Sequence, residues 1–397
     1  MNSVLNLIFF STETQGTQKI IHSPNFFNMF DKLRMLCRST LKKKYLFFGL
    51  NDAELFASEI VRKYPPIDTL NINTQNATVE EPYEALIIGF DETGSAILRK
   101  LIAATQFVGT HFKATVIVDD PKKSSKQFYK RYPEIKNHYS IEFLKFKTDT
   151  DKFNLWLEDT LFSQKQVFIA TGNDEKSMDD ANHVSVKLFI RNVEDVPVIV
   201  VLREMKDQYF EFEDEYPFAH CETIPDIIFT ENNVLKSNHL LQAKAVHHFY
   251  NQLKPFAQRI PWEQLSTMQK ESNIAMAASI YSTLKLMGKT VEEVKQMSEI
   301  EFQLFLQENP ERLLNLAISE HLRWNATYFT HGWKTWKLSE IPEGAPHQDE
   351  KLKLHACLVD WENLKEVEKR FEIPFQNYDY NNVTILRQLL INNEVIV

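Results

Sequence analysis

The strongest constraint on the fold of this chain is a short apolar segment followed by two spaced glycines. Residues Ala85 to Ile88 form an uninterrupted apolar run, and the loop Gly89-Phe90-Asp91-Glu92-Thr93-Gly94 follows it directly. Apolar residues at helical spacing come next, and a second apolar run, Ala114 to Val118, ends in Asp119-Asp120. This order of strand, helix and strand is a βαβ unit, which predicts a parallel sheet.

More predicted strands continue the pattern, with helical spacing between them. They are Ile141 to Phe146, Gln166 to Ala170, Pro197 to Leu202 and Ile227 to Thr230. Alternating strands and helices predict a doubly wound, Rossmann-like α/β domain over residues 81–235. From about Leu235 to Glu308 the apolar residues recur every three or four positions and strands are absent, so residues 236–310 are predicted to form a helical connector.

The two ends of the chain differ from this central pattern. In residues 1–80 the segment Tyr45 to Asp52 repeats the order strand, glycine, polar turn and helix, either as a degenerate half-repeat or by chance. The polar segment Asn71 to Glu81 is the predicted linker. Residues 311–397 contain Trp324, Trp333, Trp336 and Trp361, which predicts a small, mainly α-helical domain with its own aromatic core.

Charge and cysteine content narrow the class of protein. A net charge of −9 argues against direct binding of duplex nucleic acid, which needs clustered lysine and arginine. The basic clusters Lys42 to Lys44 and Lys122 to Arg131 are local, and each is either a phosphate contact or, more simply, a solvated face. Three distant cysteines fit a reducing compartment, and the apolar run near the start is too short to span a bilayer. We therefore expect a cytoplasmic protein without membrane segments.

The glycine loop has part of a phosphate-binding pattern. Gly89 and Gly94 stand at the first and third positions of the dinucleotide fingerprint, in which a helix N-terminus receives a pyrophosphate. Asp91 stands at the second position, where its carboxylate adds bulk and like charge. Asp119 or Asp120, after the next predicted strand, is placed to accept a ribose hydroxyl. A second loop, Ala170-Thr171-Gly172-Asn173, follows another predicted strand at the edge where such sheets bind ligands.

Taken together, residues 83 to 235 resemble the regulatory nucleotide-binding domain of bacterial potassium-transport proteins, the Trk/RCK type. The resemblance implies binding of NAD(H) or an adenine nucleotide without chemistry. The candidate cofactor-binding residues are Gly89, Asp91, Gly94, Asp119, Thr171, Gly172 and Asn173. Asp91 departs from the family pattern and disfavours a dinucleotide, and a sheet kept only as a scaffold is the alternative.

A carboxylate lies on an apolar stripe in the last block. Leu313, Ala317, Glu320, Trp324 and Tyr328 share one face of a predicted helix. Because an unpaired buried carboxylate is costly, Glu320 needs a partner. The candidates near it in the sequence are Arg323, Lys353 and His355.

The motifs around this stripe are similar to the ryanodine-receptor repeat domain found in bacterial proteins, over residues 312 to about 392. They are Glu320-His321-x-x-Trp324, Gly332-Trp333 and His355-x-x-Leu358, with an insert from Lys337 to Glu350 and no proline after His355. The candidate ligand-binding residues are Glu320, His321, Arg323, Trp324, Trp333, Trp336, Lys353 and His355.

These residues allow two interpretations. In the first, the tryptophans stack on a base while Arg323 and Lys353 pair with phosphates. In the second, Trp324 and Trp333 are core residues, and Glu320 with His321 ties the helices together. We favour the structural interpretation for Glu320 and Trp324, and ligand contact for Trp336 and Lys353.

The sequence offers little support for catalysis. It has no recognisable nucleophile turn and no metal-ligand spacing, so we assign no catalytic or metal-binding residue. The leading hypothesis is a non-catalytic sensor of a nucleotide or nucleotide-derived ligand that couples binding to assembly or to a partner, in bacterial signalling or defence. The alternatives are an enzyme that uses or consumes NAD, and a structural interaction module with vestigial pockets. We also expect a homodimer formed through the helical connector.

Overall fold

The structure is a computed structural model that describes residues 5–8, 10–11, 20–23, 45–46, 52–204, 207–228, 238–254 and 256–392. The chain divides into two compact units, residues 1–52 and 53–397. In the first unit β1 (Leu5–Ile8) pairs antiparallel with β3 (Ile20–Ser23), and β2 (Phe10–Ser11) with β4 (Tyr45–Leu46). The glycine turn of the predicted half-repeat lies outside the described residues, and the four-part division of the chain stays a prediction.

The segment predicted as a linker is part of the folded second unit, so that prediction was wrong. After α2 (Asp52–Lys63), β5 (Ile72–Asn73) and β6 (Thr78–Val79) form an antiparallel hairpin. The Ala77 and Val79 side chains are fully buried, and the Val79 N–H donates to the Val108 carbonyl at 2.9 Å. The segment is polar as a whole, but its Ile72, Ala77 and Val79 side chains pack into the core.

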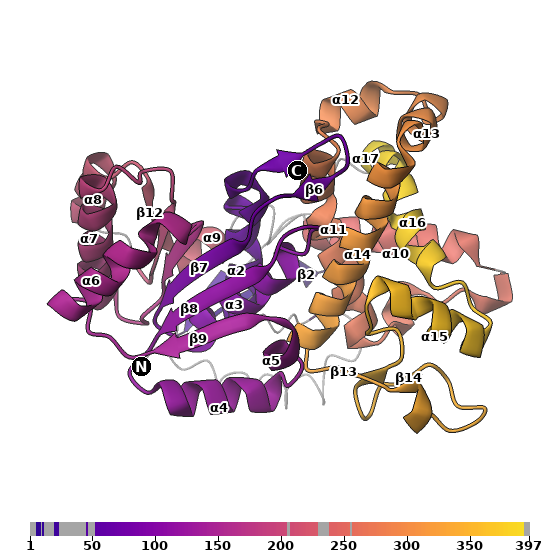
Figure 1. The fold of residues 1–397 in the computed structure, drawn as a ribbon, viewed down its shortest axis with the longest axis horizontal. Coiled ribbons are helices and arrows are strands. Elements are labelled where there is room, and N and C mark those ends of the chain that lie inside the picture. Colours follow the sequence, from indigo (N-terminus) through magenta and orange to yellow (C-terminus); the bar gives the residue numbers. More distant parts are fainter. Residues whose placement is uncertain are drawn as a thin grey trace. The chain divides into compact units, whose positions relative to one another are not determined.

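A six-stranded parallel sheet forms the centre of the second unit (Figure 1). Its strands are β7 (Tyr83–Ile88), β8 (Phe112–Ile117), β9 (Ser140–Leu144), β10 (Gln166–Ile169), β11 (Val198–Leu202) and β12 (Ala219–Thr223). They lie in the order β12-β11-β10-β7-β8-β9. Numbered along the chain, this is the 3-2-1-4-5-6 order of the Rossmann fold. The predicted doubly wound parallel sheet is therefore confirmed.

The sixth strand lies elsewhere than predicted. Residues Ile227 and Ile228 belong to helix α9 (Ile224–Ile228), and the strand is the preceding segment Ala219–Thr223. This edge strand has polar residues in its sequence, AHCET, and so lacks the continuous apolar run that marks a central strand. The apolar pair that suggested a strand is instead the buried side of a helical turn.

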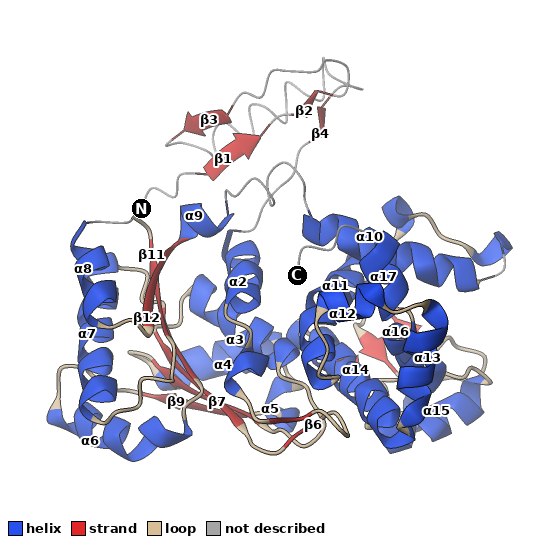
Figure 2. Cartoon of the chain, turned by 90° about the horizontal axis from the view of Figure 1, so that it is seen from above, coloured by secondary structure: helices blue, strands red, loops and turns tan. Residues whose placement is uncertain are grey.

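Helices cover both faces of the sheet (Figure 2). The helices α3 (Glu92–Ala104), α4 (Pro121–Arg131) and α5 (Ile135–His138) lie on one face. The other face carries α6 (Asp151–Thr160), α7 (Asp174–Ile190) and α8 (Asp207–Glu215). Consecutive residues of β7 supply the two cores, with Ile87 in the first and Leu86 in the second. This alternation explains why the central strands are apolar throughout.

The rest of the second unit is mainly helical, as the sequence predicted. Its helices are α10 (Asn238–Leu253), α11 (Thr267–Leu286), α12 (Val291–Gln296), α13 (Glu299–Glu308), α14 (Pro310–Thr330), α15 (Leu364–Phe371), α16 (Gln376–Thr384) and α17 (Leu386–Asn392). Short strands β13 (Lys334–Thr335), β14 (Gln348–Asp349) and β15 (Leu354–His355) form a small sheet in the order β13-β15-β14. Helix α14 is central because it contacts α3, α11, α13 and α16.

Within the described part of the chain, no helix combines the length and the apolar character needed to cross a membrane.

Candidate functional site

The predicted glycine loops meet at the topological switch point of the sheet. The chain leaves β7 toward β8 on one side and returns through β10 on the other, so the carboxyl ends of β7 and β10 are neighbours. We call the segments Gly89–Asp91 and Ala170–Asn173 the switch-point loops. A Cβ placed on Gly172 would lie 3.0 Å from Asp91 Oδ2, so the two loops are in contact. This is the position at which open α/β sheets bind ligands.

Both glycines of the first loop are required by protein packing. Gly89 has a φ of +89°, and a Cβ there would lie 2.3 Å from the Ala170 carbonyl oxygen. A Cβ on Gly94 would lie 2.7 Å from the Gly89 carbonyl oxygen. The glycines thus allow the two switch-point loops and α3 to approach one another closely. Their spacing is explained without a pyrophosphate.

Asp91 occupies the helix N-terminus that a phosphate would use. It is the N-cap of α3, and its Oδ1 accepts hydrogen bonds from the Thr93 N–H at 2.9 Å and the Gly94 N–H at 3.0 Å. A capping carboxylate satisfies these free donors and complements the helix dipole. A pyrophosphate at this position would have to displace a negative charge that the chain itself supplies.

The other residues at this sheet edge are also arranged around helix starts. Asn173 caps α7 by accepting from the Lys176 N–H, and the Thr171 hydroxyl donates to the Asn173 carbonyl at 2.9 Å. Asp119 is exposed at the end of β8, and its neighbour Asp120 caps α4. Capping therefore explains why polar residues follow these strands.

Arg203 is a residue of this site that the sequence analysis missed. It follows β11, is exposed, and its Nη2 would lie 3.9 Å from a Cβ on Gly172. Its backbone N–H donates to the Asp174 carboxylate at 3.0 Å, which fixes the turn that carries it. Only the parallel pairing of β10 with β11 brings this guanidinium to the switch-point loops.

The strand order and the position of these loops place the protein in the Rossmann-like α/β class. Comparison of the chain with models of protein families, with curated proteins and with solved structures finds no match. The two resemblances drawn from the sequence, to the Trk/RCK type and to the ryanodine-receptor repeat, therefore stay predictions.

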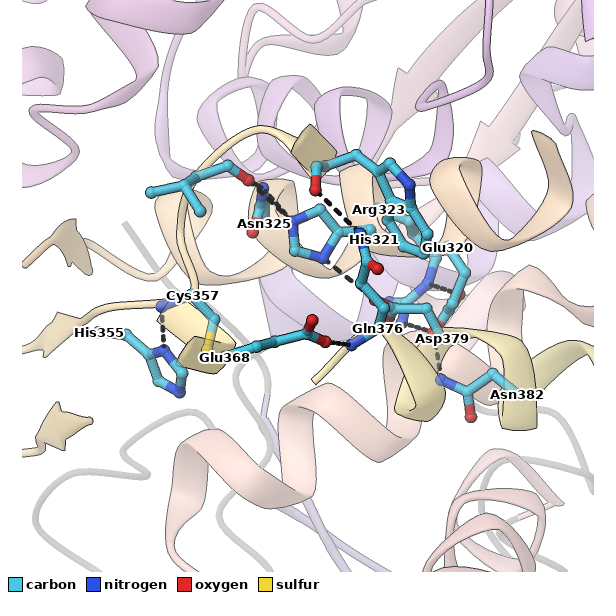
Figure 3. A network of polar contacts seen from close by, with 12 residues as sticks. Glu320, His321, Arg323, Asn325, His355, Cys357, Glu368, Gln376, Asp379 and Asn382 are labelled. Carbon is cyan, nitrogen blue, oxygen red and sulfur yellow. Dashed lines mark hydrogen bonds and ion pairs between the residues drawn. The ribbon is translucent and has the colours of Figure 1, made fainter. Parts of the chain in front are cut away.

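The second candidate site is a buried polar network on α14 (Figure 3). Glu320 forms a bidentate ion pair with Arg323, at 2.7 Å to Nε and 2.6 Å to Nη2, and accepts a third hydrogen bond from Asn382 at 2.7 Å. Burial alone would lower the pKa of Arg323, but the Glu320 carboxylate raises it above its ordinary value. Of the three partners predicted for Glu320, Arg323 is the one that pairs with it.

His321 points away from this ion pair and makes a second one. Its Nε2 lies 2.8 Å from the Val359 carbonyl oxygen, which can only accept, and its Nδ1 lies 3.2 Å from Asp379 Oδ2. Burial raises the pKa of Asp379 to about 6, whereas His321 opposes that rise. Burial lowers the pKa of His321, but Asp379 more than offsets this and raises it overall. His321 thereby connects α14 to α16 and to the loop before α15.

The cavity beside this network is small. Glu320 and Asn382 border a space of about 10 Å³ between α11, α14, α16 and α17. The Asn382 Oδ1 is buried and has no hydrogen-bond partner. A space of this size holds about one water molecule, which would satisfy that oxygen. A nucleotide does not fit there.

The aromatic residues surround His355. Trp333 and His355 are buried, Trp324 is half-buried, and the rings of Trp324 and Tyr328 lie 4.9 Å and 5.5 Å from the His355 ring. The Cys357 N–H donates to His355 Nδ1 at 3.1 Å, which requires an unprotonated Nδ1. Burial lowers the pKa of His355 to about 3. These features favour a core role for this cluster.

Trp336 and Lys353, the residues predicted to contact a ligand, lie at the border of the aromatic cluster around His355. Trp336 is half-buried against the small aromatic core and donates its backbone N–H to the His355 carbonyl. Lys353 is exposed, and its Nζ donates to the His331 carbonyl at 2.9 Å. Arg323 is not available to a phosphate beside them because Glu320 and Thr327 take its donors. In the predicted pocket, tryptophans stack on a base while Arg323 and Lys353 pair with phosphates. That pocket therefore loses Arg323, one of its two cations.

Two cysteines lie within the described residues, and both are buried free thiols. Burial raises the pKa of Cys221 to about 12 and that of Cys357 well above its ordinary value. A thiol with a raised pKa is a poor nucleophile at neutral pH. Among the described residues no cluster of three or more histidine, cysteine, aspartate or glutamate side chains is placed to hold a metal ion.

The buried His355 predicts acid sensitivity of the fold. Its pKa is about 3 in the folded chain and about 6.5 when unfolded, so the unfolded state binds more protons between these values. The contribution of His355 to the free energy of unfolding is fully present above pH 6.5. It decreases by up to about 1.4 kcal/mol per pH unit as the pH falls below that value. The pKa values of His321 and Asp379 are raised in the folded chain, so at these two groups the folded state binds more protons than the unfolded state. Their protonation therefore stabilises the fold as the pH falls, which opposes the effect of His355.

The contribution of His355 can be isolated by substitution. The free energy of urea unfolding should fall less between pH 7 and pH 5 in His355→Gln than in the wild-type chain, because glutamine keeps an acceptor but does not titrate. Equal losses in the two proteins would show that His355 is not the responsible group.

Proposed function

We propose that this chain is a non-catalytic sensor of a mononucleotide, bound at the switch-point loops. The observation that carries the proposal is that Asp91 and Arg203 both approach Gly172. Asp91 Oδ2 accepts no hydrogen bond from any described residue, whereas Oδ1 is used by the cap of α3. A free carboxylate oxygen suits a ribose hydroxyl, and an exposed guanidinium suits a phosphate.

A mononucleotide fits these charges better than a dinucleotide does. A pyrophosphate needs the N–H groups at the start of α3, and the Asp91 carboxylate already accepts from them. A single phosphate directed to Arg203 leaves the N–H groups at the start of α3 to Asp91 and has the guanidinium charge beside it. The adenine nucleotides implied by the resemblance are therefore favoured over NAD(H).

A route for transmission supports the role of a sensor. Asp91 caps helix α3, and the body of this helix packs against α14, which carries the buried polar network. The loop after α3 is fixed to the same helix, because the Val108 N–H donates to the Ser319 hydroxyl at 3.1 Å. The ring of His138 also stacks on Phe329 with centroids 4.5 Å apart. A shift of α3 on ligand binding would thus reach the C-terminal helices, and through them an assembly or a partner.

Calorimetric titration of the full chain with AMP and with NAD⁺ tests the proposal. AMP should bind more tightly than NAD⁺, and Arg203→Ala should weaken AMP binding by about 10- to 100-fold, the usual loss for a hydrogen bond to a charged group. Arg191→Ala is the matched control, because Arg191 is an exposed arginine after the far end of α7. It should leave AMP affinity unchanged.

Two outcomes would contradict the proposal. Tighter binding of NAD⁺ than of AMP would show that Asp91 does not exclude a pyrophosphate. Turnover of either nucleotide at about 1 per second or faster would identify an enzyme.

A further inference from the structure

The two outer edges of the sheet carry surface charge of opposite sign. Helix α4 packs beside the edge strand β9, and α8 packs beside the other edge strand, β12. The sequence of α4, PKKSSKQFYKR, contains no acidic residue, and that of α8, DQYFEFEDE, contains no basic residue. These two charged faces therefore lie at opposite ends of one rigid sheet.

The basic face of α4 is unneutralised. Its exposed side chains are Lys122, Lys123, Lys126, Lys130 and Arg131. Lys122, Lys126 and Lys130 follow one another at a spacing of four residues, so they share one side of the helix, whereas Phe128 is buried on the other. Among the described residues none of the five basic groups has an acidic partner. Like charges at this spacing destabilise an isolated helix.

The acidic face of α8 has the same property with the opposite sign. Glu211, Asp214 and Glu215 are exposed at three- and four-residue spacing, and Phe210 is exposed beside them. No described lysine or arginine forms an ion pair with these three carboxylates. Each helix therefore keeps a repulsion that an oppositely charged partner would relieve.

We propose that the α4 face of one copy of this chain docks on the α8 face of the next copy. A second copy is favoured over a nucleic acid for two reasons. The complementary surface is present on the same molecule, and the net charge of −9 repels a polyanion at long range. Because the two faces differ, the contact is head-to-tail, and because they lie at opposite sheet edges, each copy can make both contacts at once. The product is a chain or a ring of more than two copies rather than a closed twofold dimer.

This inference does not depend on the proposed ligand, because it is tested without one. The mass of the full chain is measured by light scattering at 50 mM and at 500 mM NaCl. Particles larger than two copies are expected at low salt, with dissociation at high salt as the charges are screened. A monomer or a dimer of constant mass at both salt concentrations would overturn the proposal.

Charge reversal on each face provides the decisive test. The triple variants Lys122→Glu/Lys126→Glu/Lys130→Glu and Glu211→Lys/Asp214→Lys/Glu215→Lys should each fail to assemble at low salt, because like charges then face one another. An equimolar mixture should assemble again, because acidic faces of one variant meet basic faces of the other. All substituted side chains are exposed, and thermal melting verifies that both variants are folded.

A control variant tests whether assembly is lost through the contact itself or through the change in net charge. Lys295→Glu/Lys351→Glu/Lys369→Glu reverses three exposed lysines elsewhere and should assemble as the wild-type chain does. Loss of assembly in this control, or a mixture of the first two variants that stays dissociated, would reject the docking of these faces. Salt-sensitive retention of the wild type on duplex DNA, without self-assembly, would assign the α4 face to a nucleic acid instead.

Discussion

Arg323→Met is expected to lower the free energy of unfolding by about 3–5 kcal/mol, the usual loss when one partner of a buried ion pair is removed. Methionine fills most of the volume of the arginine stem but supplies no charge. Glu320 would then keep its negative charge in a buried position with Asn382 as its remaining donor. Urea unfolding of the variant and the wild-type chain at pH 7 measures the difference.

The double variant Glu320→Gln/Arg323→Met distinguishes the stability lost with the ion pair from the stability lost with the packing of the arginine side chain. Glutamine still offers an oxygen to Asn382 and has no charge to neutralise, so the double variant should recover most of the lost stability. If single and double variants are equally unstable, the loss arises from the arginine side chain's packing. The charge pair would then be incidental to the fold of the C-terminal helices.

Gly89→Ala is expected to destabilise the chain by about 2–6 kcal/mol, from a strained positive φ and from overpacking together. The new methyl group would lie 2.3 Å from the Ala170 carbonyl oxygen, and that oxygen belongs to backbone that follows a central strand. Thermal or urea unfolding in the absence of any nucleotide is the measurement. The loss arises from protein packing, so it should not depend on a ligand.

Gly344→Ala is the matched control for backbone strain. Gly344 also has a positive φ, +74°, but no atom lies within 4 Å of a Cβ placed there. This variant should lose about 1–2 kcal/mol, the cost of the left-handed conformation alone. Equal losses at the two positions would mean that the switch-point loops do not need their close approach.

The sequence predicted the central sheet well because buried parallel strands are apolar along their whole length. Five of the six strands were expected near their observed positions, beginning with Ala85 to Ile88 in β7. The strand at Ala219–Thr223 was missed because it contains His220 and Glu222, which break the apolar run. The buried Glu222 is accommodated because Lys63 and Tyr64 donate hydrogen bonds to it, and these residues are far away in the sequence. The hairpin of β5 and β6 was missed because its stability depends on contacts with the loop that contains Val108.

The candidate sites were predicted less completely. The sequence indicated that Glu320 must have a partner, and Arg323, one helical turn away, is that partner. Asp379 and Asn382 were missed because they are more than fifty residues distant, and no local pattern marks them. Arg203 was missed for the same reason, because it reaches Gly172 only through the pairing of β10 with β11.

The sequence by itself determined the first five strands of the central sheet with the helices between them, the helix that carries Glu320, and the unusual Asp91 between two glycines. These follow from hydrophobic periodicity and backbone freedom, which act over a few residues. Only the tertiary structure decided what the glycines and Asp91 do, since the Ala170 carbonyl and the α3 N-terminus reach them through the fold. It also placed the basic α4 and the acidic α8 at opposite edges of the sheet, because strand order is set by packing between distant segments.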